Sequence, residues 1–258
     1  MAVLVPGVYV GMAVGLGLVV SQPLLATLIT DAVVAAGVHL ARRRRPEWFA
    51  FDPVLGGRSG VRGARAAELR WACLAVVCLV LAFAAGQVSA LWIGEIADAA
   101  GPANPSTNAP PPAVVGMTFT LLVAPIAEEA LMRGLMYPLL RRFVPPLPAI
   151  VVVTLCFAGL HANLSQAIAT IGLGLLLAVI YERTRRLWPV VALHALFNTL
   201  ALLAPGDQLA RIANGPAAIA LTLAFSAVLC LLVHRAVAHR PKWTRDGIDT
   251  ARDRQGQR

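Results

Sequence analysis

The sequence predicts an all-α, polytopic membrane helical bundle with about eight transmembrane helices and both termini in the cytoplasm. Hydrophobic residues make up 58% of the chain and charged residues only 14%, with a mean hydropathy of +0.72. A soluble domain carries roughly a quarter charged residues, because it needs a wetted surface. The basic residues, moreover, lie mostly between apolar runs rather than within them. Lipid is therefore expected to surround most of the surface.

Eight apolar runs are candidates for membrane helices. A helix needs about 20 apolar residues to cross roughly 30 Å of hydrocarbon, and local thinning of the bilayer tolerates shorter ones. The break between the first two runs depends on Pro23, because proline disfavours a helical conformation at the residue before it. Residues 4–40 are therefore interpreted as two short spans, with a single span as the alternative. The runs lie at about 4–20, 24–40, 71–93, 113–140, 147–163, 166–182, 187–204 and 215–234.

The distribution of basic residues predicts the orientation. Segment 41–70 carries eight arginines, whereas the loop 94–112 carries no lysine or arginine. Cytoplasmic loops are enriched in these residues, so 41–70 is placed in the cytoplasm. This choice puts every other basic residue in the cytoplasm except Arg133, within a span, and Arg211, in an exterior loop. Topology thus explains the net charge of +9, and no nucleic-acid motif accompanies it.

Composition divides the chain into four parts. Residues 1–112 hold the N-terminal transmembrane helices and the basic cytoplasmic loop, and 113–204 form a central helical core that carries the polar motifs described below. Residues 205–240 contain the final transmembrane helix, and 241–258 form a basic tail of mixed charge that is expected to be disordered. Arginine far outnumbers lysine and alanine is abundant, as in a GC-rich bacterial gene. We therefore expect a multi-pass protein of a bacterial plasma membrane, with membrane lipids as partners.

Three ionisable residues lie close together in the fourth apolar run: Glu128, Glu129 and Arg133. A charge at the centre of a span costs about 2.5–3.5 kcal/mol on insertion scales, so such residues indicate function or a specific pairing. Glu129 and Arg133 are four residues apart and share a helix face, with the acid first, which is the better order for pairing. Glu128 is turned by roughly 100° from Glu129. One carboxylate is therefore predicted to be structural and the other free for acid–base chemistry.

Two later runs add polar side chains at helical spacing. The fifth ends in a Phe157-to-His161 motif, and the seventh contains a His194-to-Asn198 motif. In each motif the first and last residues are four apart and lie on one helix face. Glu128, His161 and His194 all fall at membrane depth on helices close in sequence, which predicts one shared pocket. Asp31, in the second run, is not assigned to this site.

The order of these motifs resembles that of a known family. Glu-Glu-x-x-x-Arg, then Phe-x-x-x-His, then His-x-x-x-Asn, each on a membrane helix, is similar to the CPBP family. These are the CAAX-protease and bacteriocin-processing intramembrane peptidases, also called the Abi family. The resemblance covers about 114–202. It implies a membrane-embedded endopeptidase acting on hydrophobic or lipidated substrates, such as a prenylated CAAX-type segment or a bacteriocin-like peptide.

The resemblance also implies a role for each polar residue. Glu128 resembles the general base that activates water, aided by His161. His194 and Asn198 resemble the pair that stabilises the tetrahedral oxyanion through hydrogen bonds. Arg133 is expected to hold Glu129 and the local backbone in place.

Two questions stay open at this level. Glu128, His161 and His194 would supply a catalytic zinc site with one open position, as in a metalloprotease, whereas a glutamate-activated water needs no metal. We favour the metal-free mechanism. The alternative functions are a non-catalytic immunity or scaffolding protein and a proton-coupled transporter, both of which also use buried polar residues. Substrate identity, cleavage site and oligomeric state do not follow from the sequence.

Overall fold

A computed structural model describes residues 4–19, 23–50, 64–98, 113–161 and 164–204, with the single positions 220, 224, 227 and 228. Every regular element in these residues is helical, which confirms the all-α prediction. Four helical stretches within them are long and apolar enough to cross a bilayer: Leu25–Arg44, Trp71–Trp92, Val114–Arg141 and Leu164–Thr184. The protein is an integral membrane protein. The predicted eighth span, 215–234, falls almost entirely outside the described residues, and the tail 241–258 falls wholly outside them.

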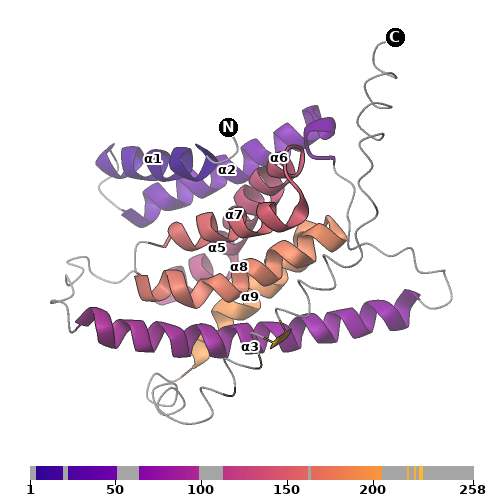
Figure 1. Ribbon diagram of the computed structural model, residues 1–258. Helices are drawn as coiled ribbons and strands as arrows, with labels where there is room; N and C mark the ends of the chain where they lie inside the picture. Colours follow the sequence, from indigo (N-terminus) through magenta and orange to yellow (C-terminus); the bar gives the residue numbers. More distant parts are fainter. Residues whose placement is uncertain are drawn as a thin grey trace.

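The described helices form three groups (Figure 1). Helices α1 (Leu4–Val19) and α2 (Pro23–Arg44) pack against each other on one side, and a short turn, η1 (Pro46–Trp48), follows α2. The long α3 (Ala64–Asp98) lies on the opposite side. The remaining helices lie between them and carry the polar motifs. Residues 4–40 therefore form two helices, as the proline at position 23 predicted.

The central group begins with one uninterrupted helical stretch. It consists of α4 (Ala113–Thr118), η2 (Phe119–Val123), α5 (Ala124–Glu129), η3 (Ala130–Met136) and α6 (Tyr137–Arg141), in which η2 and η3 are π-helical. The group is completed by α7 (Pro146–Gly159), α8 (Leu164–Thr184) and α9 (Leu187–Leu203). These elements match the predicted fourth to seventh runs, with one exception in extent.

That exception is the fifth run, which was predicted to be helical over 147–163. Helix α7 has 14 residues and ends at Gly159. At 1.5 Å per residue it is about 21 Å long, so it can cross roughly 30 Å of hydrocarbon only where the bilayer is locally thinned. Prolines fix its beginning at position 146, and glycine favours termination at its end. The predicted range was therefore wrong at its C-terminal end, and His161 lies beyond the helix.

Each π-helical element precedes a proline. Pro125 lies at the start of α5, directly after η2, and Pro138 lies at the start of α6, directly after η3. Proline lacks an amide hydrogen and its ring crowds the carbonyl four residues earlier, which disrupts a regular α-helix. The wider π turn accommodates both effects. At these points the amides of Ala124 and Tyr137 donate to carbonyls five residues back.

Helix α8 is the centre of the bundle, because it packs against α3, α7 and α9. Its approach to α3 requires a glycine: a β-carbon on Gly86 would collide with the carbonyl oxygen of Ala169. Small residues permit such close contacts in membrane bundles, where van der Waals packing drives helix association. Leu173 and Leu177, on α8, are completely buried in the apolar core.

Many large apolar side chains face outward. Val8, Val77, Leu122 and Leu155 are examples, and each is more than half exposed. A water-soluble monomer rarely exposes so much apolar surface, whereas a bilayer favours it. The outer surface of the described helices therefore agrees with a lipid environment.

Candidate active site

Four of the predicted polar residues meet between three neighbouring elements. Glu128 and Glu129 lie at the end of α5, Arg133 lies in η3, and His194 lies in α9. Helix α9 packs against both α5 and η3, which brings residues about 65 positions apart in sequence into contact. The two acids and the arginine thus do not face lipid.

Glu129 is the hub of this cluster. Its Oε1 atom accepts a hydrogen bond from Arg133 Nη1 at 2.9 Å and lies 3.0 Å from His194 Nδ1. The Glu129 and Arg133 side chains are completely buried. In an ion pair with a guanidinium the carboxylate oxygen accepts, so we assign the Nδ1 atom of His194 as the donor of this bond. The predicted Glu129–Arg133 ion pair is confirmed, and His194 joins it.

Arg133 is held by two further contacts. Its Nη2 atom donates to the carbonyl oxygen of Gly174 on α8 at 2.8 Å. Its guanidinium carbon lies 4.8 Å from the centre of the Phe157 ring. A β-carbon on Gly174 would lie 3.1 Å from a Thr154 methyl carbon and 3.3 Å from the Phe157 ring. Glycine therefore lets α8 approach α7 closely at the position that anchors the arginine.

Glu128 has a different environment from its neighbour. Its Oε2 atom lies 3.9 Å from His194 Nε2, beyond hydrogen-bond distance, and its side chain is 20% exposed. This oxygen is itself buried and has no hydrogen-bond partner among the described residues. The two acids thus divide as predicted: Glu129 is neutralised by arginine, whereas Glu128 faces the second nitrogen of His194.

His161 lies near this cluster without touching Glu128. Because α7 ends at Gly159, the His161 Nδ1 atom turns back to the carbonyl oxygen of Phe157, at 3.2 Å. Histidine commonly satisfies the last carbonyls of a helix in this way. The Phe157 ring lies edge-on to both His161 and His194, with ring centres 5.5 Å apart in each case. Phe157 therefore contacts both histidines, and within the described part of the chain no hydrogen bond or ion pair joins His161 to Glu128.

Asn198 contacts the backbone of the other π-helical element. Its Nδ2 atom donates to the carbonyl oxygen of Thr120 at 2.8 Å. In η2 the amide of Ala124 donates to the carbonyl oxygen of Phe119 and is not available to Thr120. The next donor along the helix would be the amide of residue 125, but this residue is a proline and has no amide hydrogen. Asn198 satisfies this orphaned acceptor and ties α9 to η2. One hydrogen of its amide group is thereby committed.

One acid near the site was left unassigned by the sequence. Asp31 on α2 is 2% exposed, and its Oδ1 atom accepts a hydrogen bond from the Tyr9 hydroxyl at 2.7 Å. It is also close enough to Glu128 for an electrostatic interaction. In the sequence Asp31 stands out as an acid in an apolar run. Only helix packing shows that its partner is a tyrosine on α1.

A second ionic cluster was missed altogether. Glu182 on α8 accepts hydrogen bonds from Arg141 at 3.1 and 3.3 Å and from the Tyr137 hydroxyl at 2.9 Å. Glu182 is completely buried and Arg141 nearly so. Arg141 stands at the end of an apolar run and was therefore included among the basic residues placed in the cytoplasm. Packing against α8 buries it instead.

The candidate metal ligands do not form a metal site in this conformation. In the described ranges, no group of three or more His, Cys, Asp or Glu side chains is gathered closely enough to hold a metal ion. The ring contacts do not decide the question, because His194 and His161 each use Nδ1 and leave Nε2 open, as zinc-bound histidines often do. It is their placement that does not fit a zinc ion: Glu128, His161 and His194 are not gathered into one ligand set among the described residues.

Comparison with known proteins finds a match, and it covers the segment that holds this site. Residues 110–200 match the family model of type II CAAX prenyl endopeptidases, described as Rce1-like. All six predicted site residues fall within the Rce1-like segment, and the match supports the resemblance to CAAX proteases drawn from the motifs. No curated protein and no solved structure matches the chain.

Proposed function

We propose that this protein is an intramembrane endopeptidase that hydrolyses peptide bonds of membrane-associated substrates, with Glu128 activating the attacking water. The observation that carries the proposal is the unequal use of two adjacent carboxylates. The Oε1 atom of Glu129 is shared by Arg133 and His194, whereas Glu128 makes no hydrogen bond to a described residue and directs a buried oxygen toward His194. A buried polar atom without a partner in a native fold calls for a functional explanation.

In this proposal the reaction begins at Glu128. The carboxylate takes a proton from water as the water oxygen attacks the peptide carbonyl carbon, and later returns the proton to the leaving amine. His194 contributes through Nε2, because Glu129 occupies its Nδ1 side, and Nε2 can donate a hydrogen bond to the oxyanion when the ring carries both protons. Glu129 and Arg133 act as positioning residues that fix the orientation of this imidazole.

The remaining roles follow the same geometry. We assign His161 to assist Glu128, with Phe157 between the two histidine rings as a rigid apolar wall. We assign Asn198 and His194 to stabilise the oxyanion, using the amide hydrogen of Asn198 that does not bind Thr120. Hydrogen-bond donors held in place before the reaction are worth most in a site from which water is excluded.

Hydrophobic or lipidated peptides are the proposed substrates, including prenylated CAAX-type or bacteriocin-like segments. The family match and the apolar helices around the site support this class. We propose that the protein lies in a bacterial plasma membrane, crosses it eight times and has both termini in the cytoplasm. The arginine-rich loops support this orientation. We propose a metal-free mechanism, because the carboxylate–histidine pair already supplies a base and a hydrogen-bond donor.

The decisive experiment is cleavage of a panel of lipidated and unlipidated peptides by the purified protein, with and without a chelator. The isosteric change Glu128→Gln is expected to lower turnover by about 10²- to 10⁴-fold, since it removes the general base. Its thermal stability should match wild type. The matched control is Glu47→Gln. Glu47 is an exposed acid in η1, far from Glu128 in the sequence, and this variant should cleave the peptides normally. Full activity of the Glu128 variant would refute the proposal, and inactivation by chelator would refute the metal-free mechanism.

A further inference from the structure

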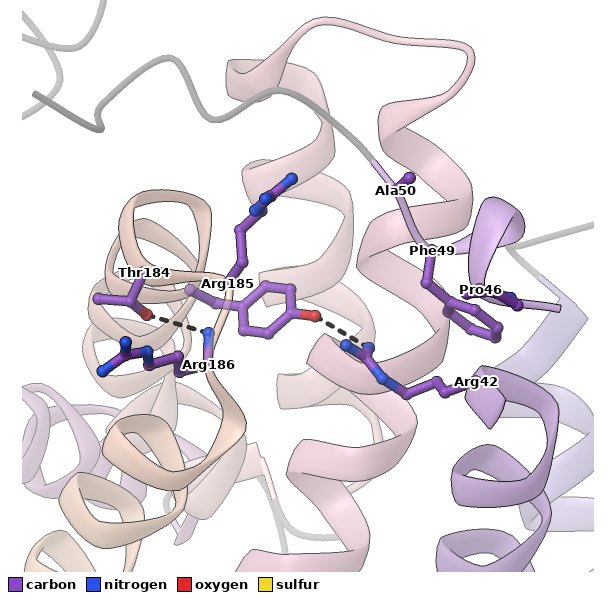
Figure 2. Close-up of a pocket in the computed structure, with 8 residues that line it drawn as sticks. Arg42, Pro46, Phe49, Ala50, Thr184, Arg185 and Arg186 are labelled. Carbon is purple, nitrogen blue, oxygen red and sulfur yellow. Dashed lines mark hydrogen bonds between the residues drawn. The ribbon is translucent and has the colours of Figure 1, made fainter. Parts of the chain in front are cut away.

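A polar cavity lies apart from the predicted site, where two membrane-crossing helices end. It has a volume of about 520 Å³ and opens between the end of α2 with η1 and the turn after α8 (Figure 2). The spans Leu25–Arg44 and Leu164–Thr184 both stop at this level. The cavity therefore lies at the predicted membrane surface, on the side where the basic loops gather. Its size falls within the range of about 300–1,000 Å³ typical of small-ligand sites.

The lining is strongly cationic. Three of its residues are arginines, and no acidic residue is among the described residues that line it: Arg42, Pro46, Phe49, Ala50, Tyr181, Thr184, Arg185 and Arg186. The rest of the wall is a tyrosine, a phenylalanine and small or polar groups. Arginine presents several donors in a planar fork that matches the oxygens of a phosphate group. The lining thus fits an anion with several oxygens.

Arg42 is held ready on one edge of the cavity. Its Nη1 atom donates to the Tyr181 hydroxyl at 3.1 Å and to the carbonyl oxygen of Gly134 at 2.9 Å. Its guanidinium carbon lies 5.3 Å from the centre of the Phe49 ring. The hydrogen bonds it makes to other described residues involve Nη1 alone. These contacts fix the guanidinium plane and keep Nε and Nη2 available for a ligand.

The Gly134 contact connects the cavity to η3. In a regular α-helix the carbonyl of Gly134 would accept from the amide of residue 138, which is a proline. Arg42 supplies the missing donor. Arg42 therefore stabilises η3, the element that carries Arg133. A ligand bound to Arg42 would contact this same side chain.

Arg185 occupies an unfavourable backbone conformation beside the cavity. Its φ angle is 53°, and it is the single described non-glycine residue with positive φ. Its amide closes the end of α8 by donating to the carbonyl of Tyr181 at 2.8 Å. Glycine is the usual residue at such a position, because side chains are strained there. Strain of this kind is concentrated at functional sites, where it holds a side chain in a required place.

We propose that this cavity binds a phosphate group, supplied by the headgroup of an anionic phospholipid in the surrounding leaflet. Three features support this assignment: the position of the cavity at the predicted membrane surface, its three arginines and the strained backbone of Arg185. Basic pockets between membrane helices on the cytoplasmic side are suited to anionic headgroups. This assignment does not depend on the proposed peptidase activity.

The test uses the full-length protein in a non-ionic detergent, with binding measured by native mass spectrometry and by the shift in thermal unfolding midpoint. The probes are short-chain phosphatidylglycerol, short-chain phosphatidylcholine and inorganic phosphate at constant ionic strength. Saturable stabilisation by phosphatidylglycerol, and much weaker stabilisation by phosphatidylcholine, is expected. Equal affinity for inorganic phosphate would support the phosphate site but assign it to a soluble ligand. Absence of saturable binding by either phosphate probe would overturn the proposal.

The discriminating variant is Arg185→Gly. Glycine removes the guanidinium and relieves the positive φ, so the unliganded protein should unfold at the wild-type temperature or above. Phosphatidylglycerol affinity should fall about tenfold, since a charge-assisted bond to phosphate is lost. Arg186→Gln is the second variant and should weaken binding without altering the turn.

The matched control is Arg43→Gln with Arg44→Gln. These exposed arginines lie on α2 beside the cavity but do not line it. If the control loses as much affinity as Arg185→Gly, binding depends on general surface charge and the proposed site is wrong.

Discussion

Two buried ionic clusters lie in the same bundle, and they differ in how completely their polar atoms are paired. The first, which we call the closed cluster, consists of Glu182, Arg141 and Tyr137. The second, the open cluster, consists of Glu128, Glu129, Arg133 and His194. Both contain an arginine and a completely buried glutamate. Their contents are similar, so composition alone does not distinguish them.

In the closed cluster both carboxylate oxygens of Glu182 accept hydrogen bonds. Arg141 donates to each of them, and the Tyr137 hydroxyl donates to one. The remaining edge of the guanidinium donates to the carbonyl oxygen of Val144. Such a two-point arginine–carboxylate contact is strong and geometrically specific. It has the properties of a structural link between α6 and α8.

In the open cluster three buried atoms lack a hydrogen-bond partner among the described residues: Glu128 Oε2, Glu129 Oε2 and Arg133 Nε. The fourth such atom in the described chain, Thr154 Oγ1, belongs to α7 beside Gly174. Leaving buried polar groups unpaired costs free energy, so their concentration at one place requires a reason. Of these groups only Glu128 has an exposed portion, at 20% of its side chain, where a ligand could complete the pairing; Glu129 and Arg133 are completely buried. The comparison teaches that completeness of pairing, more than charge, separates the closed cluster from the one proposed to be reactive.

Breaking the closed cluster should have the largest effect on stability. Glu182→Leu leaves the Arg141 guanidinium and the Tyr137 hydroxyl buried without their carboxylate, and should lower the free energy of unfolding by about 3–5 kcal/mol. Denaturant unfolding in detergent measures this change. Turnover per folded molecule should stay close to wild type. The double variant Arg141→Met with Glu182→Leu should recover most of the loss, and failure to recover would show that the cluster does more than fill the core.

Glu129→Gln tests the hub of the open cluster. Glutamine keeps the size but removes the charge that Arg133 and His194 share, so we expect a loss of about 2–3 kcal/mol in unfolding free energy. Turnover should fall by about 100-fold, because a neutral amide oxygen orients and stabilises the His194 ring less strongly than a carboxylate does. Thermal unfolding and peptide cleavage on the same sample separate the two effects. If stability falls but turnover is unchanged, Glu129 and Arg133 have only a structural role, like the residues of the closed cluster.

Tyr9→Phe asks whether Asp31 belongs to the open cluster. The change removes the hydroxyl that donates to Asp31, leaving a buried carboxyl oxygen without this partner, and should cost about 1–2 kcal/mol of stability. A shift in the pH dependence of cleavage is expected as well, since Asp31 interacts electrostatically with Glu128. An unchanged pH profile would assign Asp31 to helix packing alone.

Asn198→Ala should have the smallest effect on stability, about 1 kcal/mol, since one hydrogen bond to a backbone carbonyl is lost. If Asn198 also stabilises the oxyanion, turnover falls by about 100-fold or more. Thr199→Ala is the control on the same helix, because Thr199 bonds only the carbonyl of Ala195 within α9 among the described residues. Equal turnover in the two variants would restrict Asn198 to tying α9 to η2.

Several features followed directly from the sequence. Apolar run lengths predicted helices throughout, and seven of the eight predicted runs correspond to described helical segments. The proline at position 23 predicted a hairpin of two helices, and the four-residue spacing of Glu129 and Arg133 predicted their ion pair. The order of the polar motifs indicated the protease family. All of these depend on local chemistry: hydropathy, backbone restriction and neighbours one helical turn apart.

Other features came only from the tertiary structure. The sequence did not indicate that His194 would share an oxygen of Glu129, that Arg141 would be buried against Glu182, or that His161 would lie past the end of its helix. Pro125 and Pro138 were visible, but the side chains that replace their missing amide donors come from Asn198 and Arg42, 73 and 96 residues away respectively. Sequence determined which groups need partners, because that is a property of each residue. Packing decided which partners they found, because that depends on how distant helices meet.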